Sequence, residues 1–267
     1  MKLTLHTAPE VPLEAEVIGP TSLNGLTEAE VSALTVHHGN RKEALGEFFT
    51  VTGKMNGRLE LEGDLSFVKL LGKGMSGGQM IIDGNVSGHL GVGMSGGRIV
   101  VNGNAQDWVG EDMKGGSIII KGNAGHMVGC VVRGAEVGMQ GGEIIVHGNC
   151  KNEAGGGLRR GLIAIGGNSG DFTGLNMLAG SIFVLGEMGI RTGAGMKRGS
   201  IVSMKPAQML PTFSYSCTYQ PIFLRFYLNY LRELGLVIDD AWLTGSYQRW
   251  CGDSIELNKG EILLYHS

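Results

Sequence analysis

The middle of the chain is built from a repeat of nineteen residues, and this repeat limits the available folds more than any other feature. Its most regular column is apolar and advances in steps of nineteen, with one longer step of twenty-six before Met139. The column consists of Met75, Met94, Met113, Met139, Leu158, Met177 and Met196. One insertion of seven residues, within Cys130–Val137, therefore interrupts an otherwise constant period.

The length of the repeat excludes most repeat architectures. Helical repeats need about 33 to 47 residues, and a propeller blade needs about 40 or more. The unit here has the form M-x-G-G-x-I-I-V-x-G-N, which holds one short β-branched run between turn residues. Such a unit predicts one coil of a solenoid, with strands that pair in parallel between neighbouring coils. We therefore predict an all-β fold, a right-handed parallel β-helix of about seven coils over residues 51–204.

Side-chain alternation along each β-branched run assigns faces to the columns of the repeat. One column is apolar throughout and should point inward: Met80, Ile99, Ile118, Ile144, Ile163, Ile182 and Ile201. A second column, two residues later, should do the same: Ile82, Val101, Ile120, Val146, Ile165 and Val184. The flanking columns are mixed, with Gln79 and Arg98 on one side and Asp83 and Asn102 on the other. We expect those columns to face solvent or partners.

Glycine and asparagine fill further columns, and we interpret both as structural. The chain has 47 glycines, most of them between Val51 and Met204, which predicts many corners with positive φ. An asparagine column follows one glycine column and should bond along the stack as a ladder: Asn85, Asn104, Asn123, Asn149 and Asn168. The runs GMSGG and GNAG resemble nucleotide loops, but no helix follows them to hold a phosphate.

Both ends of a solenoid must be capped, because the last coil otherwise presents bare strand edges. Residues 1–50 are predicted to form an N-terminal cap with a short helix over residues 26–34, with Thr27 as the N-cap. Residues 205–267 are predicted to form a helical and aromatic segment followed by a short strand near residues 260–264. An apolar stripe in that helix should lie against the last coil or a neighbouring subunit: Ile222, Phe223, Phe226, Tyr227 and Tyr230.

Composition and motifs argue against several classes of function. A net charge of −3 and a pI near 6.2 do not indicate nucleic-acid binding. The sequence lacks a secretory signal, a long apolar run and any CxxC pair among its four cysteines, so we expect a cytoplasmic protein with reduced thiols. It has no HExxH motif, its histidines are scattered, and its two GMSGG runs lack the helix that follows the serine in a nucleophile elbow. We expect neither a catalytic residue nor a metal site in this chain.

The cluster that stands out is basic. Arg159 and Arg160 lie where other coils have Ser-Gly or Lys-Gly, and Lys197 and Arg198 occupy the same corner two coils later. Positions two coils apart are about 10 Å apart along a stack of strands, so these four charges should share one edge. The edge is either a charged interface or solvated ridge, or a groove that holds an anionic cofactor tail or acidic partner by charge-assisted hydrogen bonds.

The run GGxIIIxGNxGxxxGxxM resembles the C subunit of formylmethanofuran dehydrogenase and the C subunit of the bacterial formyltransferase/hydrolase complex. It also resembles the C-terminal β-helix of glutamate synthase. Three further segments sharpen the resemblance: VPLEAEVI, RRGLIAIGGNSGDFTG at 159–174 and LPTFSYSCTYQPIFLRFYL at 210–228. The last two are more similar to the bacterial complex. With GDSIELNKGEIL near the end, the resemblance covers nearly the whole chain.

The resemblance implies a non-catalytic structural subunit in one-carbon metabolism. The bacterial complex transfers a formyl group from formyl-tetrahydromethanopterin to methanofuran and hydrolyses it to formate. Its implied partners are an amidohydrolase-like hydrolase subunit, a formyltransferase subunit and a subunit like the B subunit of the dehydrogenase. No cofactor would be bound firmly by this chain, although methanofuran would be present in the complex. Methanofurans carry acidic, glutamyl-type tails, which makes Arg159, Arg160, Lys197 and Arg198 candidate contacts.

Three alternatives stay open at this point. The chain could be the C subunit of a molybdenum or tungsten formylmethanofuran dehydrogenase, or a structural module of the glutamate-synthase type. A stand-alone polysaccharide-degrading β-helix would need clustered carboxylates, whereas Asp107 and Asp171 share a column but lie three coils apart. The insertion around Arg133 is our candidate for a docking protrusion, because a loop added to one coil must project from the stack.

Overall fold

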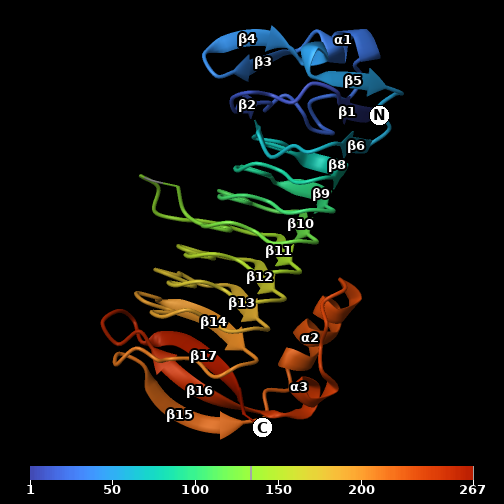
Figure 1. Ribbon diagram of the computed structural model, residues 1–267. Coiled ribbons are helices and arrows are strands. Elements are labelled where there is room, and N and C mark those ends of the chain that lie inside the picture. The colour runs from blue at the N-terminus through green and yellow to red at the C-terminus, as the bar shows by residue number, and fades with distance from the viewer. Residues whose placement is uncertain (133, 267) are drawn as a thin grey trace.

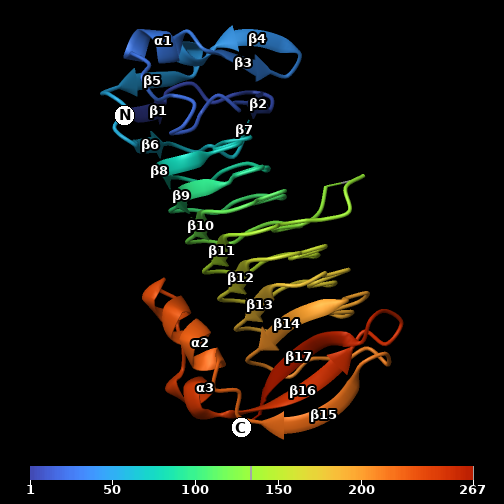
Figure 2. The same ribbon diagram turned by 180° about the vertical axis from the view of Figure 1, so that it is seen from behind.

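The computed structural model describes residues 1–132 and 134–266, and it shows a protein made mostly of strands with few helices (Figures 1 and 2). The all-β prediction is therefore confirmed. Arg133, which we predicted to lie in a docking protrusion, falls outside the described residues. Within the two described ranges, no helix is both long enough and apolar enough to span a membrane.

The elements fall into three groups along the chain. The first group is β1 (Lys2–Leu5), β2 (Leu13–Glu14), α1 (Glu28–Ser32), β3 (Thr35–His38), β4 (Arg41–Ala44), η1 (Leu45–Glu47) and β5 (Phe49–Thr52). The second is β6 (Arg58–Glu62), β7 (Val68–Lys69), β8 (Ser76–Asp83), β9 (Gly96–Val101), β10 (Ser117–Ile120), β11 (Glu143–Val146), β12 (Leu162–Ile165), β13 (Ser181–Val184) and β14 (Arg198–Ser203). The third is β15 (Ser214–Tyr219), α2 (Leu224–Glu233), α3 (Asp240–Thr244), β16 (Ser246–Gly252) and β17 (Lys259–His266).

One long sheet runs through the molecule. Its order is β15-β16-β17-β14-β13-β12-β11-β10-β9-β8-β6-β1-β5, and a small sheet with the order β4-β3-β2-β7 lies at the N-terminal end. From β1 through β6 to β14 and on to β17, neighbouring strands of the long sheet are parallel. Figures 1 and 2 show these strands stacked like steps, each followed by a long loop on one side. Among the described strands of this sheet, antiparallel pairing occurs at its two ends, in β5 and in β16 with β15.

The strand register follows the repeat. Ile99 pairs with Ile118, and Ile163 pairs with Ile182, each one repeat further along the chain. Ile118 pairs with Ile144 across the insertion, so the seven extra residues leave the sheet undisturbed. Every residue of the two predicted inward columns is buried, which confirms the assignment of the inner face. The β-branched runs therefore stack in register to form the inner core.

The asparagine column forms the predicted ladder. The Oδ1 atom of Asn104 accepts hydrogen bonds from the backbone N–H of Asn123 (2.8 Å) and from its Nδ2 (3.2 Å), and Asn123 relates to Asn149 in the same way. The adjoining glycine column was expected to need positive φ, but Gly122 and Gly148 do not have it. A Cβ atom at either position would clash with the Oδ1 atom of the preceding asparagine. Glycine is required there by close approach of the coils.

Glycines with positive φ occupy a different column, the corner that begins with Gly72 (φ 69°) and Gly91 (φ 69°). At Gly91 a Cβ atom would also approach the Cδ1 atom of Ile118 to 2.6 Å, so both conformation and space select glycine. Here the prediction of left-handed corners is confirmed.

A helix covers part of the outer face of the sheet, which the repeat did not reveal. Leu224, Leu228 and Leu231 of α2 are buried and belong to a second apolar cluster together with the outward residues Ile145 and Phe183. Figures 1 and 2 show α2 lying beside the C-terminal half of the stack. The buried stripe of the helix is thus made of leucines rather than of the aromatic residues singled out from the sequence.

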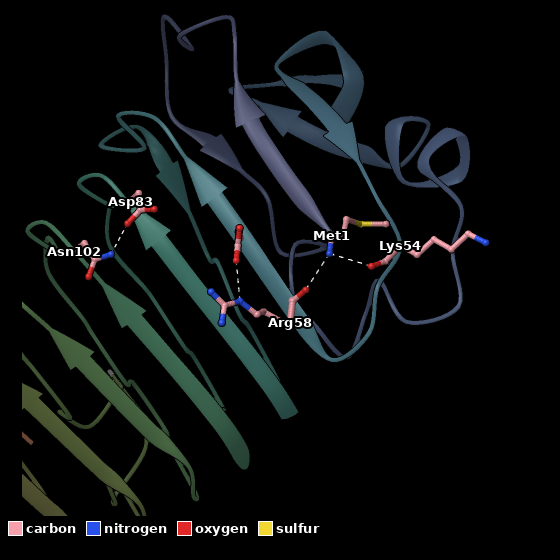
Figure 3. Close-up of polar contacts among 6 residues, drawn as sticks. Met1, Lys54, Arg58, Asp83 and Asn102 are labelled. Atoms are coloured by element: carbon pink, nitrogen blue, oxygen red, sulfur yellow. Dashed lines mark hydrogen bonds and ion pairs between the residues drawn. The ribbon is translucent and has the colours of Figure 1, made fainter.

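The N-terminal end is closed by β1, β5 and α1. The amino group of Met1 donates hydrogen bonds to the carbonyl oxygens of Lys54 (3.0 Å) and Arg58 (3.1 Å), which ties β1 between β5 and β6 (Figure 3). Thr27 caps α1 and forms a capping box with Glu30, as the sequence predicted for the N-cap. The helix itself is shorter than the predicted range of residues 26–34.

Candidate functional site

The four basic residues predicted to share an edge lie at the corner that precedes the strands of the long sheet. We call Arg159, Arg160, Lys197 and Arg198 the basic edge. The pairing of Leu162 with Ser181, and of Ser181 with Ser200, places Arg160 and Arg198 at equivalent positions two strands apart. Both arginines, like Arg159, are exposed, whereas Lys197 is half-buried.

Local packing explains why these arginines are missing from three of the first four coils of the methionine column. In all four of those coils the residue equivalent to Arg160 is glycine: Gly77, Gly96, Gly115 and Gly141. A Cβ atom at any of the last three would collide with a carbonyl oxygen of the preceding coil, whereas one at Gly77 would meet nothing within 4 Å. Close contact between coils therefore excludes side chains from this corner in three of the four earlier coils.

A further basic residue lies beside this edge and could not be found from the repeat. Strand β17 pairs in parallel with β14, which sets Lys259 directly opposite Arg198. Lys259 is exposed and comes from the segment after the repeat ends. The one signal for it in the sequence is the spacing of Lys259-Gly260-Glu261-Ile262, which matches Arg198-Gly199-Ser200-Ile201.

The acids near the basic edge are mostly occupied by other groups. Glu261 accepts hydrogen bonds from the Nε atom of Arg249 (2.7 Å) and from the hydroxyl of Ser200 (2.7 Å). The Nζ atom of Lys197 is 3.9 Å from a carboxylate oxygen of Glu256, a long and exposed pair that contributes little. Among the described residues, no ion pair includes Arg159, Arg160 or Arg198. The edge therefore keeps positive charge that is available to an anion.

A shallow cleft of about 410 Å³ joins the basic edge to α2, and its lining includes Arg160, Glu143, Ser181 and Tyr227. The hydroxyl of Tyr230 donates a hydrogen bond to Glu143 (2.7 Å). Burial, and then this contact with Glu143, raise the pKa of Tyr230 to about 12, so the phenol stays a neutral donor. The helix is thus fastened at one wall of the cleft.

The aromatic residues proposed as an interface from the sequence point in two directions. Tyr227 lies against the sheet, with its ring 5.2 Å from that of Phe183. Phe223, Phe226 and Tyr230 are exposed, and Phe226 has an exposed fraction of 78%. The aromatic stripe therefore divides between the outer core and the free face of α2. The remaining predicted interface residue, Arg133, lies outside the part of the chain that the structure describes.

Other polar columns of the repeat are structural. The Oδ1 atom of Asp107 accepts from the backbone N–H of His126 (2.8 Å), and Asp171 accepts from the N–H of Ile190 (3.0 Å). Each of these acids binds the coil that follows it, which explains why they share a column without forming a carboxylate pair. In residues 1–132 and 134–266, no group of three or more potential metal ligands converges.

Parallel strands stacked in register, a ladder of asparagines and an exposed basic edge define a repeat protein. No protein-family model matches the chain. It is 44% identical over 79 residues to the C subunit of the molybdenum-containing formylmethanofuran dehydrogenase 1 of Methanothermobacter marburgensis, which is 29% of this chain and 20% of that protein. It is 39% identical over 90 residues to the C subunit of the tungsten-containing formylmethanofuran dehydrogenase 2 of Methanothermobacter thermautotrophicus, 32% of this chain and 33% of that one.

These matches span a third or less of the length of the curated relatives. A solved structure is similar over the whole chain. It is the crystal structure of the formyltransferase/hydrolase complex from Methylorubrum extorquens in complex with methylofuran, of which one chain matches with a TM-score of 0.91 and 30% identity, covering 100% of both chains. The chain therefore belongs to the family of C subunits of formyltransferase/hydrolase complexes, which is homologous to the C subunit of formylmethanofuran dehydrogenase.

Proposed function

We propose that this chain is a non-catalytic structural subunit of a complex that transfers a formyl group from formyl-tetrahydromethanopterin to methanofuran and hydrolyses it to formate. The observation that carries the proposal is the match over the full length of both chains to a member of the formyltransferase/hydrolase complex. The partners in this proposal are a hydrolase subunit of the amidohydrolase type, a formyltransferase subunit and a subunit like the B subunit of the dehydrogenase. The cytoplasmic location expected from the cysteines stays a prediction.

Purification from the native host tests this proposal. A tagged chain should co-purify with an amidohydrolase-like subunit and a formyltransferase, and the assembly should release formate from formyl-tetrahydromethanopterin. Mass spectrometry of the co-purifying proteins and an assay for formate are the two measurements. A chain that purifies alone and as a monomer would contradict the proposal.

A second candidate is the C subunit of a molybdenum or tungsten formylmethanofuran dehydrogenase. It is favoured by the local identity of 39% to 44% to such subunits, which is higher than the 30% to the bacterial complex but covers only about a third of the chain or less. The same purification separates the two candidates, because molybdopterin and iron–sulfur partners would accompany a dehydrogenase.

We also propose that the stack is a right-handed parallel β-helix that serves as a scaffold, with residues 1–50 as an N-terminal cap, 51–204 as the helix and 205–267 as a C-terminal segment. Parallel strands whose register advances by one repeat from coil to coil support the β-helix. The antiparallel strands at both ends of the sheet support the caps. In this division β17 adds one more strand to the helix from the C-terminal segment.

For the basic edge we propose a contact with the anionic tail of a methanofuran-type cofactor. Support comes from the exposure of Arg160 and Arg198, from Lys259 opposite Arg198, and from the lack of ion-pair partners for these arginines within the described residues. Arginine binds carboxylates through two parallel hydrogen bonds, which suits a glutamyl tail. The cofactor would be held by the complex as a whole, and no firm binding to this chain alone is proposed.

The test for this contact is charge reversal in the assembled complex. Arg160→Glu/Arg198→Glu should retain the subunits but release the furan cofactor at lower salt, with retention reduced about tenfold at moderate ionic strength. Arg41→Glu, at an exposed position on β4 at the opposite end of the chain, is the matched control. Cofactor content is measured by mass spectrometry after salt washes. Unchanged retention would refute the contact, and loss of subunits would favour a charged interface.

The free face of α2 is our candidate for a subunit interface. Phe226 is 78% exposed on a helix whose other face is already buried, and Phe223 at the N-cap is exposed as well. The ring of Tyr230 is partly exposed, while its hydroxyl is held by Glu143. Exposed aromatic residues on one side of a helix are typical of protein interfaces. Phe226→Ser should weaken assembly with the partner subunits while leaving the unfolding midpoint of the isolated chain unchanged, because the side chain contributes little to the folded core.

A further inference from the structure

The two ends of the molecule differ in how well their edge strands are protected from pairing with another chain. At the N-terminal end, the edge strand of the long sheet is β5, which carries no charge but packs against α1, and Glu28 of α1 accepts a hydrogen bond from the backbone N–H of Gly53 (2.6 Å). The edge strand of the small sheet is β4. That strand carries Arg41, Lys42 and Glu43. Charged side chains on an edge strand prevent its pairing with another chain. The N-terminal edge is thus protected.

The C-terminal edge strand β15 lacks this protection. Its sequence is SYSCTY, and no charged residue occurs anywhere between Lys205 and Arg225. Five of its six residues are exposed, including Tyr215 at 52%. Strand β16 pairs with one side of β15, and no strand in the described part of the chain pairs with the other side. A row of free backbone donors and acceptors therefore faces outward along an uncharged strand.

We propose that β15 pairs in antiparallel fashion with β15 of a second copy of this chain, so that the long sheets of two copies join end to end. An antiparallel pair of identical strands has twofold symmetry, which is the commonest symmetry of soluble oligomers. The absence of charge matters here, because a strand that carried Lys or Glu would face the same charge across the symmetry axis.

The boundaries of β15 favour one closed dimer over an open fibre. Pro211 and Pro221 flank the strand, and a bulge lies between Tyr215 and Cys217. Proline removes a backbone donor and a bulge bends the edge, so the free edge can pair only over a few residues and in few registers. Each copy has one such edge. Once two copies have paired along it, no free edge of this kind is left, and the assembly stops at a dimer.

Additional contact area is available next to the strand. A pair of six-residue strands alone buries less than the roughly 1,200 Å² that stable interfaces need. Ile222 and Phe223, which follow β15 after Pro221, are exposed at 65% and 41%. These side chains extend the uncharged surface from the edge of the sheet to the start of α2. A second copy that pairs along β15 would cover Ile222 as well, whereas Phe223 belongs to the face of α2 proposed above for the other subunits.

The exposed Cys217 on β15 provides a natural site for a cross-linking test of this pairing. Cys217 lies near the middle of β15 and is exposed, whereas Cys130 and Cys150 are buried and Cys251 is half-buried. In a twofold antiparallel pair, the two Cys217 side chains come close to the symmetry axis. A short bis-maleimide reagent applied to the purified full chain, and to the assembly from the native host, should join two copies through Cys217. Cys217→Ser should abolish the product.

A charge variant supplies an independent measurement. Ser216→Lys/Thr218→Lys places two like charges on the edge and should raise the dimer dissociation constant at least about tenfold, as followed by analytical ultracentrifugation. The control Asn56→Lys/Asn229→Lys adds the same charge at exposed positions away from β15 and should leave the dimer intact. Equal thermal unfolding of both variants confirms that neither change acts through folding.

Three outcomes would overturn the pairing: a monomer at all concentrations, Cys217 modified without cross-linking, or Cys217 linked to a different polypeptide in the native assembly. The last would mean that β15 accepts a strand from another subunit. This proposal does not rest on the proposed function, because formate release and the identity of the co-purifying subunits report on that function separately. Either can fail while the other holds.

Discussion

The inner and outer faces of the long sheet carry two separate apolar cores with different origins. The inner core contains residues such as Ile144 and Ile163, which are fully buried and recur in every coil from β8 to β14. The outer core contains Ile145 and Phe183, and it is closed by α2. Further toward the N-terminus, the outward residue Val100 is only half-buried because the helix does not extend over it fully.

This difference shows how a repeat protein acquires specific surfaces. The inner core is made by neighbouring coils that all contribute the same kind of side chain, so each strand supports the next. The outer core depends on one segment that follows the repeat and folds back over it. Repetition builds the stack, and the non-repeated segment decides which part of the outer face is covered and which is left free for partners.

The largest effect is expected from a cavity in the inner core. Ile144→Ala should lower the free energy of unfolding by about 2 to 5 kcal/mol, because the coils on both sides hold their positions and the space cannot collapse. Urea unfolding followed by circular dichroism measures the change. Ile81→Ala, at a half-buried outward position of β8, is the control and should cost less than about 1 kcal/mol. Equal losses would show that the two faces do not differ.

A substitution in the outer core should affect only the elements next to it. Leu228→Ala in α2 is expected to cost about 2 to 3 kcal/mol, in the lower part of the range for such changes, because the helix can shift over the sheet. Hydrogen exchange should show lost protection in α2 and unchanged protection in β11 to β13. If β11 to β13 lost protection as well, the two cores would be one cooperative unit, and the distinction between them would be wrong.

The inner core could be predicted from the sequence because its signal recurs with the period of the repeat. The register, the inward columns and the asparagine ladder each appear in five or more coils, so a misplaced column would be visible at once. The role of Gly122 was harder to infer, since glycine fits both positive φ and close approach. Only the position of the Asn104 side chain in the preceding coil decides between them.

The outer core and part of the candidate site could not be predicted in this way. Helix α2 has two stripes at helical spacing, one with Leu224 and Leu228 and one with Phe223 and Phe226, and hydrophobicity alone does not decide which one is buried. The structure buries the leucines. Lys259 reaches the basic edge because β17 pairs with β14 across a long non-repeated segment. Pairing over that distance breaks the period of the repeat, and the only signal left in the sequence is the local match of residues 259–262 to residues 198–201.

The asparagine ladder should contribute less than either core. Asn123→Ala removes the acceptor for the backbone N–H of Asn149 and leaves that donor without its partner, at a cost of about 1 to 2 kcal/mol. Faster exchange of the Asn149 amide and a lower urea midpoint are the expected results. Asn56→Ala, at an exposed turn, serves as the control and should change neither. An unchanged Asn149 amide would mean that the ladder is not a stabilising element.

The smallest effect concerns pH at the point where α2 ends over the sheet. Burial lowers the pKa of His147 below its usual value near 6.5, and the ammonium group of Lys121, 3.2 Å from its Nε2 atom, lowers the pKa further. A hydrogen bond to the backbone of Leu234 acts in the opposite direction. Because the unfolded chain binds the proton more readily, His147 stabilises the fold above pH 6.5, and this contribution is lost as the pH falls toward the lower folded pKa.

The variant Lys121→Met separates the effect of the Lys121 charge on the pKa of His147 from the effect of burial. Without the ammonium group, the pKa of His147 should rise toward its usual value, as read from the chemical shift of the imidazole during titration. The stability that is lost as the pH falls should then be smaller than in the unmodified chain. The C-terminal turn of α2 should also stay protected from hydrogen exchange to lower pH. If the pKa of His147 were the same in this variant as in the unmodified chain, the ammonium group of Lys121 would be too well hydrated to act on His147. In that case burial beneath α2, the element that distinguishes the outer core, would be the cause of the lowered pKa.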